Sequence, residues 1–287
     1  MNKNQYRLVF SRIRGMLIAV EETASSSGKA CRAEAVCVGH SRPGRGVARF
    51  ALRHAALAAL LAAGAMPLLG EAQVMGAGAN APKVVQTANG LPQVNINKPS
   101  AAGVSLNTYS QFDVQKPGVI VNNSPVMTNT QQAGYINGNP NFGANDAARI
   151  IINQVNSNNP SQLRGYVEVA GQRAEMIISN PAGLVVDGGG FINTSRAILT
   201  TGTPNLNADG SLAGFDTTRG LITVQGAGLN AGHVDQVDLI ARAVHANAAI
   251  YTNTLNVVAG ANRVDHDTLQ TTRIQGEVAI VCRFRKR

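Results

Sequence analysis

The sequence has no tryptophan, few other aromatic residues and only three cysteines among its 287 residues. Cys31 and Cys37 lie near the N-terminus and Cys282 lies near the C-terminus, so the long middle of the chain carries no thiol. This excludes a domain held together by disulfide bonds. The thiol-free middle is long enough to bury a core of its own. It is also suited to an oxidising compartment, because it has no cysteines to mispair.

The middle of the chain also lacks net charge. Residues 73–275 hold 11 Lys and Arg and 11 Asp and Glu, whereas residues 1–72 hold 10 and 4, and residues 276–287 hold 4 and 1. The formal net charge of +9 therefore belongs to the two ends. A nucleic-acid-binding domain carries Lys and Arg on its folded surface, where they replace the counterions of phosphates. We therefore expect no nucleic-acid partner.

An apolar run near the N-terminus indicates export. Residues 55–69 form a run shorter than the roughly 20 residues that a membrane-spanning helix needs. The run is followed by Gly70-Glu71-Ala72, whose small residues suit signal peptidase. We expect cleavage between Ala72 and Gln73, after the inner-membrane export machinery has engaged the leader. An ordinary signal peptide has about 15–30 residues, so the long segment ahead of the apolar run needs a separate explanation, and a short cytoplasmic helix is one alternative.

From Gln73 onward the composition is typical of β structure. Short stretches rich in Val, Ile and Leu recur between Gly, Asn, Asp and Pro residues, often about ten residues apart. This spacing alone suits a sandwich or a barrel equally well. Asparagines at the ends of stretches favour a parallel β-helix, in which they stack in ladders between coils. The expected strands are residues 93–97, 118–122, 148–153, 165–170, 174–179, 183–186, 196–200, 221–225, 237–241 and 255–259.

The first coil of such a stack would expose unpaired backbone groups. Residues 84–121 are interrupted by three prolines and carry several large apolar side chains. Terminal units of solenoids are usually atypical, so we expect this segment to form an irregular N-terminal cap.

An ordered series of motifs then points to a known family. The motifs are residues 89–96, 103–107, 111–114, 117–123, 139–142, 177–184, 199–202 and 257–263. The series resembles the two-partner secretion domain that opens filamentous haemagglutinins and the large toxins of contact-dependent growth inhibition. Residues 1–3, 6–10 and 15–20 resemble the extended signal peptide region of such exoproteins. The resemblance assigns residues 1–72 to the extended signal peptide and residues 73–275 to the secretion domain.

The resemblance implies an all-β fold, a right-handed parallel β-helix. It also implies a non-enzymatic secretion module with no cofactor, secreted or held at the surface of a Gram-negative bacterium. Its partner would be an outer-membrane β-barrel transporter with periplasmic POTRA domains. The downstream effector is an adhesin, a haemolysin or a growth-inhibition toxin, and neither it nor a receptor is named by the sequence.

Two turn motifs are the candidate recognition residues. Asn139-Pro140-Asn141-Phe142 resembles the family's Asn-Pro-Asn-Leu motif, and Asn180-Pro181-Ala182-Gly183 resembles its Asn-Pro-Asn-Gly motif. The turns either present a surface to the transporter or only shape the β-helix. One turn bond contributes on the order of 1 kcal/mol, so we expect replacing Asn139 or Asn180 with Ala to lower secretion more than the melting temperature. Ala182 departs from the family pattern and removes one side-chain bond, whereas Phe142 keeps an apolar contact.

No catalytic or metal-binding constellation stands out. Asp265-His266-Asp267 lacks the further ligands of a calcium or zinc site, so we expect a solvated turn there. A secreted β-helix carbohydrate-active enzyme is one alternative function and requires paired carboxylates, but the acidic residues are scattered singly. A free-standing adhesin is another alternative.

The last twelve residues, 276–287, form a divergent basic tail that departs from the resemblance and is consistent with a truncated or frameshifted product. A solenoid that stops after residues 255–259 would leave the edge of its last coil uncovered. We therefore expect concentration-dependent oligomers.

Overall fold

The computed structural model describes residues 6–11, 16–21, 73–274 and 280–285. They belong to two compact units, residues 1–66 and 67–287. All regular elements within these described ranges are strands. None of the described segments is a helix long and apolar enough to cross a membrane. Ala72, on one side of the predicted cleavage site, lies outside the described residues.

In the first unit, β1 (Tyr6–Ser11) and β2 (Met16–Glu21) pair as an antiparallel hairpin, with Tyr6 opposite Glu21. The alternative of a short helix is therefore wrong for these residues.

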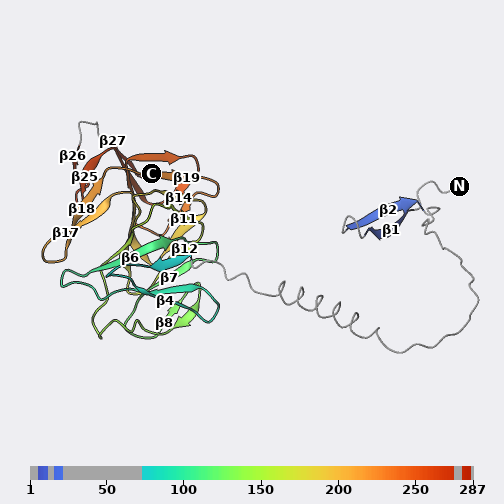
Figure 1. Cartoon of the computed structure of the whole chain (residues 1–287), viewed down its shortest axis with the longest axis horizontal. Helices are drawn as coiled ribbons and strands as arrows, with labels where there is room; N and C mark the ends of the chain where they lie inside the picture. Colours follow the sequence, from blue (N-terminus) through green and yellow to red (C-terminus); the bar gives the residue numbers. More distant parts are fainter. Residues whose placement is uncertain (1–5, 12–15, 22–72, 275–279, 286–287) are drawn as a thin grey trace, which may run out of the picture. The chain divides into compact units, whose positions relative to one another are not determined.

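The second unit is a β-helix whose chain winds through three sheets (Figure 1). The first sheet contains β27 (Ile280–Arg285), β24 (Thr254–Ala259), β21 (Gln236–Ala241), β16 (Thr194–Thr200), β13 (Ala174–Ser179), β10 (Ile150–Val155), β6 (Val104–Phe112) and β3 (Val74–Gly76). The second contains β11 (Ser161–Leu163), β14 (Leu184–Val186), β19 (Leu221–Val224) and β22 (Ala243–Ala246). The third contains β23 (Ile250–Tyr251), β20 (Leu229–Asn230), β15 (Gly189–Ile192), β12 (Tyr166–Gly171), β7 (Val119–Asn123), β5 (Pro92–Asn95) and β4 (Lys83–Gln86).

From β10 to β24, apart from the inserted β17 and β18, successive strands fall on the first, second and third sheet in turn, and neighbouring coils pair in parallel. Each of the ten expected stretches overlaps a strand of this helix, with bounds that differ by up to two residues, so the predicted parallel β-helix is confirmed. The expected asparagine ladder is present where the Nδ2 atom of Asn122 donates to Oδ1 of Asn95 at 3.0 Å. The strands that carry these two asparagines, β5 and β7, pair in parallel, with Asn95 directly opposite Asn122.

Antiparallel strands close the ends of the stack. At the start, β3 pairs with β6 and β4 pairs with β5. The antiparallel part of the cap is smaller than the expected residues 84–121, because β6 pairs in parallel with β10 and β5 pairs in parallel with β7. At the other end of the first sheet, β27 pairs antiparallel with β24, with Thr254 opposite Arg285. The expectation of an uncovered edge at residues 255–259 was therefore wrong, because part of the basic tail covers it.

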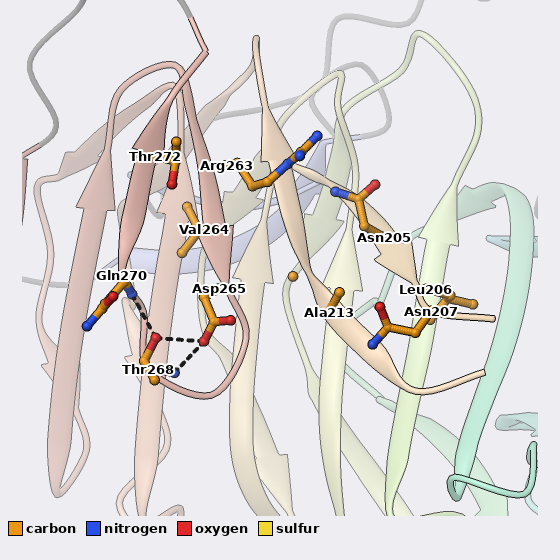
Figure 2. A pocket seen from close by; sticks show the side chains of 11 residues that line it. Asn205, Leu206, Asn207, Ala213, Arg263, Val264, Asp265, Thr268, Gln270 and Thr272 are labelled. Carbon is orange, nitrogen blue, oxygen red and sulfur yellow. Dashed lines mark hydrogen bonds between the residues drawn. The ribbon is translucent and has the colours of Figure 1, made fainter. Parts of the chain in front are cut away.

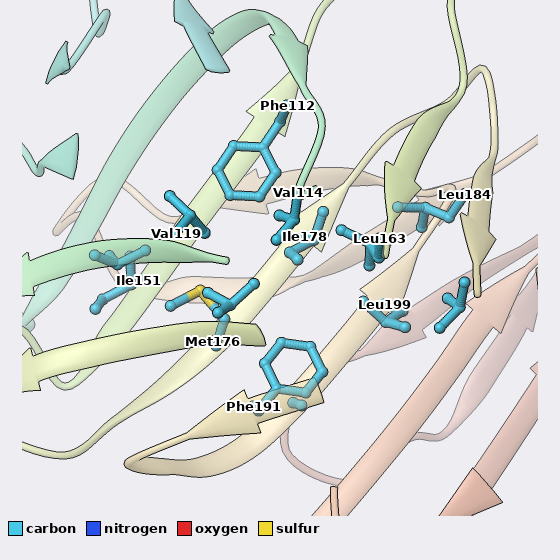
Figure 3. Packing of buried hydrophobic residues seen from close by; sticks show 14 of the residues in the cluster. Phe112, Val114, Val119, Ile151, Leu163, Met176, Ile178, Leu184, Phe191 and Leu199 are labelled. Carbon is cyan, nitrogen blue, oxygen red and sulfur yellow. The ribbon is translucent and has the colours of Figure 1, made fainter. Parts of the chain in front are cut away.

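The main core fills the inside of the β-helix with apolar side chains from all three sheets (Figure 3). The first sheet is also buried on its outer face, where Ile152, Ile177 and Ile198 lie under Phe215 and Val264. Strands covered on both faces read as continuous apolar runs rather than as alternating ones. This explains sequences such as that of β13, Ala-Glu-Met-Ile-Ile-Ser.

Two insertions lie outside the coils. A four-stranded outer sheet has the order β17 (Thr203–Leu206), β18 (Leu212–Thr217), β25 (Asn262–Asp265) and β26 (Thr271–Arg273) (Figure 1). Its apolar side chains cluster with those of the first sheet. A hairpin of β8 (Thr128–Thr130) and β9 (Gly134–Ile136) is inserted between β7 and β10. Its Ile136 packs on Ile120 and Ala170 of the third sheet.

Candidate functional site

The first predicted turn follows the β8–β9 hairpin and is organised by a buried asparagine. Asn139 is 2% exposed, and its Oδ1 accepts a hydrogen bond from the backbone N–H of Asn141 at 3.0 Å. Its Nδ2 donates to the carbonyl oxygens of Ile96 and Asn122 at 2.9 and 3.0 Å. The N–H of Phe142 donates to the carbonyl of Asn139, and the Phe142 ring packs against the main core. Pro140 and Asn141 are exposed.

The second predicted turn repeats this geometry at the corner between β13 and β14. Asn180 is fully buried, and its Oδ1 accepts from the N–H of Ala182 at 2.9 Å. Its Nδ2 donates to the carbonyl of Asn159 and to Oγ of Ser161, both at 2.9 Å. Gly183 closes the turn by donating its N–H to the carbonyl of Asn180.

Residue types explain both turns. Proline fixes φ near −65° at the second position, and the Asn side chain satisfies the amide two residues on. Gly183 has φ of 125°, in the region that favours glycine, and an added Cβ would lie 3.0 Å from the carbonyl oxygen of Leu221. Asn141 additionally donates from Nδ2 to the Ile96 carbonyl at 3.0 Å. Ala182 has no side-chain donor for an equivalent bond.

The two turns are held by different parts of the chain. The hydrogen-bond partners of Asn139 come from the region of β5 and β7, whereas those of Asn180 come from the segment around β11. In each motif the asparagine faces the interior of the protein rather than the solvent. The side-chain hydrogen bonds of the two asparagines therefore go to the protein's own backbone and to Ser161.

Sequence reasoning missed Glu168, a buried carboxylate that holds the tip of the β8–β9 hairpin. Glu168 lies on β12 and is 3% exposed. Its Oε1 and Oε2 accept the backbone N–H groups of Gln131 and Gln132 at 2.6 and 2.9 Å. The partners are 36 and 37 residues away in sequence, so no local pattern could have revealed the contact.

His266 belongs to a second missed feature, an ionic cluster between the outer sheet and the first sheet. Its Nε2 lies 2.7 Å from Oε1 of Glu175 and its Nδ1 lies 2.7 Å from Oδ1 of Asp267. Arg196 donates from Nη2 to the His266 carbonyl at 2.9 Å and from Nε to Asp238 at 2.5 Å. The prediction of a solvated turn was wrong for His266, which is 5% exposed. Asp267 does face solvent.

A polar pocket of the outer sheet has a volume of about 640 Å³ (Figure 2). Its polar side chains are amides and hydroxyls together with Arg263, and Asp265 is its one carboxylate. Hydrogen bonds from Thr268 lower the pKa of Asp265 below its ordinary value, which suits a turn better than a general acid. A pair of carboxylates, as the carbohydrate-active alternative requires, is not found in this pocket. Among residues 73–274 no three His, Cys, Asp or Glu are arranged to hold a metal ion.

Comparison with known families covers most of the chain. Residues 72–281 match the TPS secretion domain. Residues 1–51 match the extended signal peptide of the type V secretion system.

Individual proteins agree with these matches. The chain is 59% identical to the tRNA nuclease CdiA-2 of Burkholderia pseudomallei (strain 1026b) and 45% identical to the toxin CdiA of Yersinia pestis, in each case over 96% of the chain. It spans only 9% and 8% of the length of these two relatives. Among solved structures, it resembles the filamentous hemagglutinin secretion domain with a TM-score of 0.63 and 36% identity, over 70% of this chain and 68% of the other.

Proposed function

Because the chain belongs to the family of TPS secretion domains, we propose that its folded domain is the address by which a partner transporter in the outer membrane recognises a large exoprotein. The chain is exported across the envelope of a Gram-negative bacterium and is secreted or held at the cell surface. The observation that carries the proposal is the match of residues 72–281, together with the likeness to a solved secretion domain.

We propose that the transporter uses periplasmic POTRA domains and that it reads the domain after the inner-membrane machinery has delivered it. Signal peptidase would cleave between Ala72 and Gln73. N-terminal sequencing of the periplasmic protein tests this cleavage site. A mature start upstream of residue 51 contradicts it.

The two motifs, residues 139–142 and 180–183, contribute by holding the surface that the transporter reads. Support comes from the burial of Asn139 and Asn180 and from the hydrogen bonds that each makes to distant backbone. In this proposal the asparagines position the recognised surface and do not touch the transporter.

The function proposed for this chain is non-enzymatic. The relatives are named as a nuclease and a toxin, and we propose that those activities reside in the large part of each relative that this chain does not match.

The test compares secretion of the full chain in cells with and without the partner transporter. We expect the protein in the medium with the transporter present, and a folded protein retained in the periplasm without it. Equal secretion in both strains contradicts the proposed function. The nearest control is an unrelated periplasmic protein, whose location should not change.

A further inference from the structure

Three strongly exposed large apolar side chains lie on or next to the β8–β9 hairpin. The side chains of Val126, Met127 and Tyr135 are 64%, 65% and 75% exposed, more than any other large apolar side chain among the described residues. Other exposed large apolar residues, such as Leu221 and Tyr251, lie on separate elements. Single exposed apolar side chains are ordinary, but a group of them marks an interaction site more often.

The strand register explains how the hairpin presents these side chains. Asn129 lies opposite Tyr135, and Thr128 lies opposite Ile136. Because side chains alternate along a strand, Ile136 faces the third sheet while Tyr135 faces away from it. Met127 precedes Asn129 by two residues and so continues the outward side. Val126 precedes the strand and joins this side by its exposure alone. We call Val126, Met127, Asn129 and Tyr135 the outward hairpin face.

Buried polar contacts fix the hairpin at its tip and at its base. At the tip, the Glu168 carboxylate accepts two backbone N–H groups. At the base, the N–H of Asn139 donates to the carbonyl of Ser124 at 2.7 Å, and Nδ2 of Asn122 donates to the carbonyl of Asn137 at 3.0 Å. Burying a carboxylate is unfavourable unless it is well bonded. A surface that is ordered before binding loses less entropy on association.

Charge indicates what kind of surface the hairpin fits. Residues 117–145 contain no Asp, Glu, Lys, Arg or His, although charged residues recur along the rest of residues 73–275. An uncharged face with an exposed Tyr and Met resembles the centre of a protein interface, where charged residues are depleted. It is unsuited to a phosphate backbone or an anionic lipid surface, both of which require cations.

We propose that the outward hairpin face is the contact surface for an uncharged, apolar patch on the periplasmic part of the partner transporter. This inference rests on the proposed function. It gives the first motif a defined role, because Asn139 is then a positioning residue at the base of the hairpin and the contact itself is made by Tyr135 and Met127.

The test uses the full chain with its transporter and compares two triple variants. V126S/M127S/Y135S alters the hairpin, and L206S/L221S/Y251S alters equally apolar exposed side chains on other elements. We expect secretion of the hairpin variant to fall at least about tenfold, as for interface anchors, with periplasmic accumulation. The control variant should be secreted like the parent, and both variants should keep the parent's melting temperature.

A binding measurement uses the purified periplasmic part of the transporter. We expect weaker binding of the hairpin variant only, with little change of the parent's affinity on adding salt, because residues 117–145 carry no charged side chain. Should the triple variant melt early, Tyr135→Lys alone provides the second test. Its side chain is 75% exposed, so the fold should tolerate it.

Several results overturn the inference. One is normal secretion of the hairpin variant or of Tyr135→Lys. Another is an equal loss of secretion in both triple variants. A third is a hairpin variant that loses only self-association and still binds the transporter like the parent. If secretion of the parent does not depend on the transporter, the proposed function fails instead. If secretion depends on the transporter but not on the hairpin, only this inference fails.

Discussion

Asn180 shows how much structure a single side chain of the second motif holds. Its amide makes three hydrogen bonds in a fully buried position. Replacing Asn180 with Ala leaves several buried groups without partners, at about 1–3 kcal/mol each. We therefore expect Asn180→Ala to lower the free energy of unfolding by more than the roughly 1 kcal/mol of a single turn bond, as measured by urea denaturation.

Ala182→Asn is the matched control for Asn180→Ala, because it restores the family's residue in the same turn. Its half-buried position leaves room for the side chain to reach solvent, so the free energy of unfolding should change by less than about 1 kcal/mol. An Asn180→Ala variant that unfolds at the parent's urea concentration would show that the bonds are not stabilising.

At the residue scale, the sequence predicts what depends on near neighbours. The bond from each turn asparagine to the amide two residues on could be predicted from the motif. The bonds from the same side chains to Ile96 and Asn159 could not, because those partners are 43 and 21 residues away. The roles of Glu168 and His266 could not, because His266 meets Glu175 across 91 residues. The partners of such buried ionisable groups are set by the winding of the coils.

At the element scale, His266 joins the outer sheet to the first sheet. Burial lowers the pKa of His266, but the hydrogen bond and the charge of Glu175 outweigh burial and raise it above its ordinary value. The Arg196 charge opposes this rise and the Asp267 charge supports it. Both ring nitrogens lie beside carboxylates, and only the doubly protonated ring can donate to both of them.

This cluster predicts a pH-dependent stability. Because the folded pKa is raised, the protonated ring stabilises the fold fully below its unfolded pKa of about 6.5. That contribution is lost as the pH rises through the folded pKa. The free energy of unfolding of the parent, minus that of His266→Gln, should therefore decrease with rising pH, as measured by urea denaturation at several pH values.

Glu175→Gln is the control for the pH dependence. It removes the main charge that raises the pKa of His266 while keeping a hydrogen-bond partner of similar size. In the Glu175→Gln background, the difference in the free energy of unfolding with and without His266→Gln should decrease less with rising pH, or not at all. A difference between parent and His266→Gln that is constant with pH would mean that the ring does not change its protonation in this range.

The outer sheet marks the limit of what strand patterns can predict. The ten stretches were found because each is a short apolar run between turn residues. Residues 203–206 and 212–217 instead form a hairpin of mixed polar and apolar residues inserted between two coils. Its strand β18 pairs with β25, which follows almost fifty residues later. Its apolar side chains, among them Phe215, meet the first sheet only in the folded protein.

At the scale of the whole molecule, stability against association depends on how the stack ends. All coils of the first sheet pair in parallel from β6 to β24, and β27 then pairs antiparallel with β24. An exposed strand edge is a template for another chain. With β27 present, the edge of β24 is occupied, so the oligomers expected from the sequence should not form through this strand.

Removing β27 should expose the edge of β24 and so promote association. A variant that lacks residues 280–287 leaves the backbone groups of β24 unpaired on one side, and we expect concentration-dependent oligomers in light scattering, with the parent staying monomeric. The deletion also removes four basic residues, which by themselves could promote association. K286Q/R287Q therefore serves as a control that lowers the charge but keeps β27 with Arg283 and Arg285, since charged residues protect the end strand that β27 itself forms, and it should remain monomeric. A monomeric deletion variant, or a parent that associates equally, would show that β27 does not protect the edge.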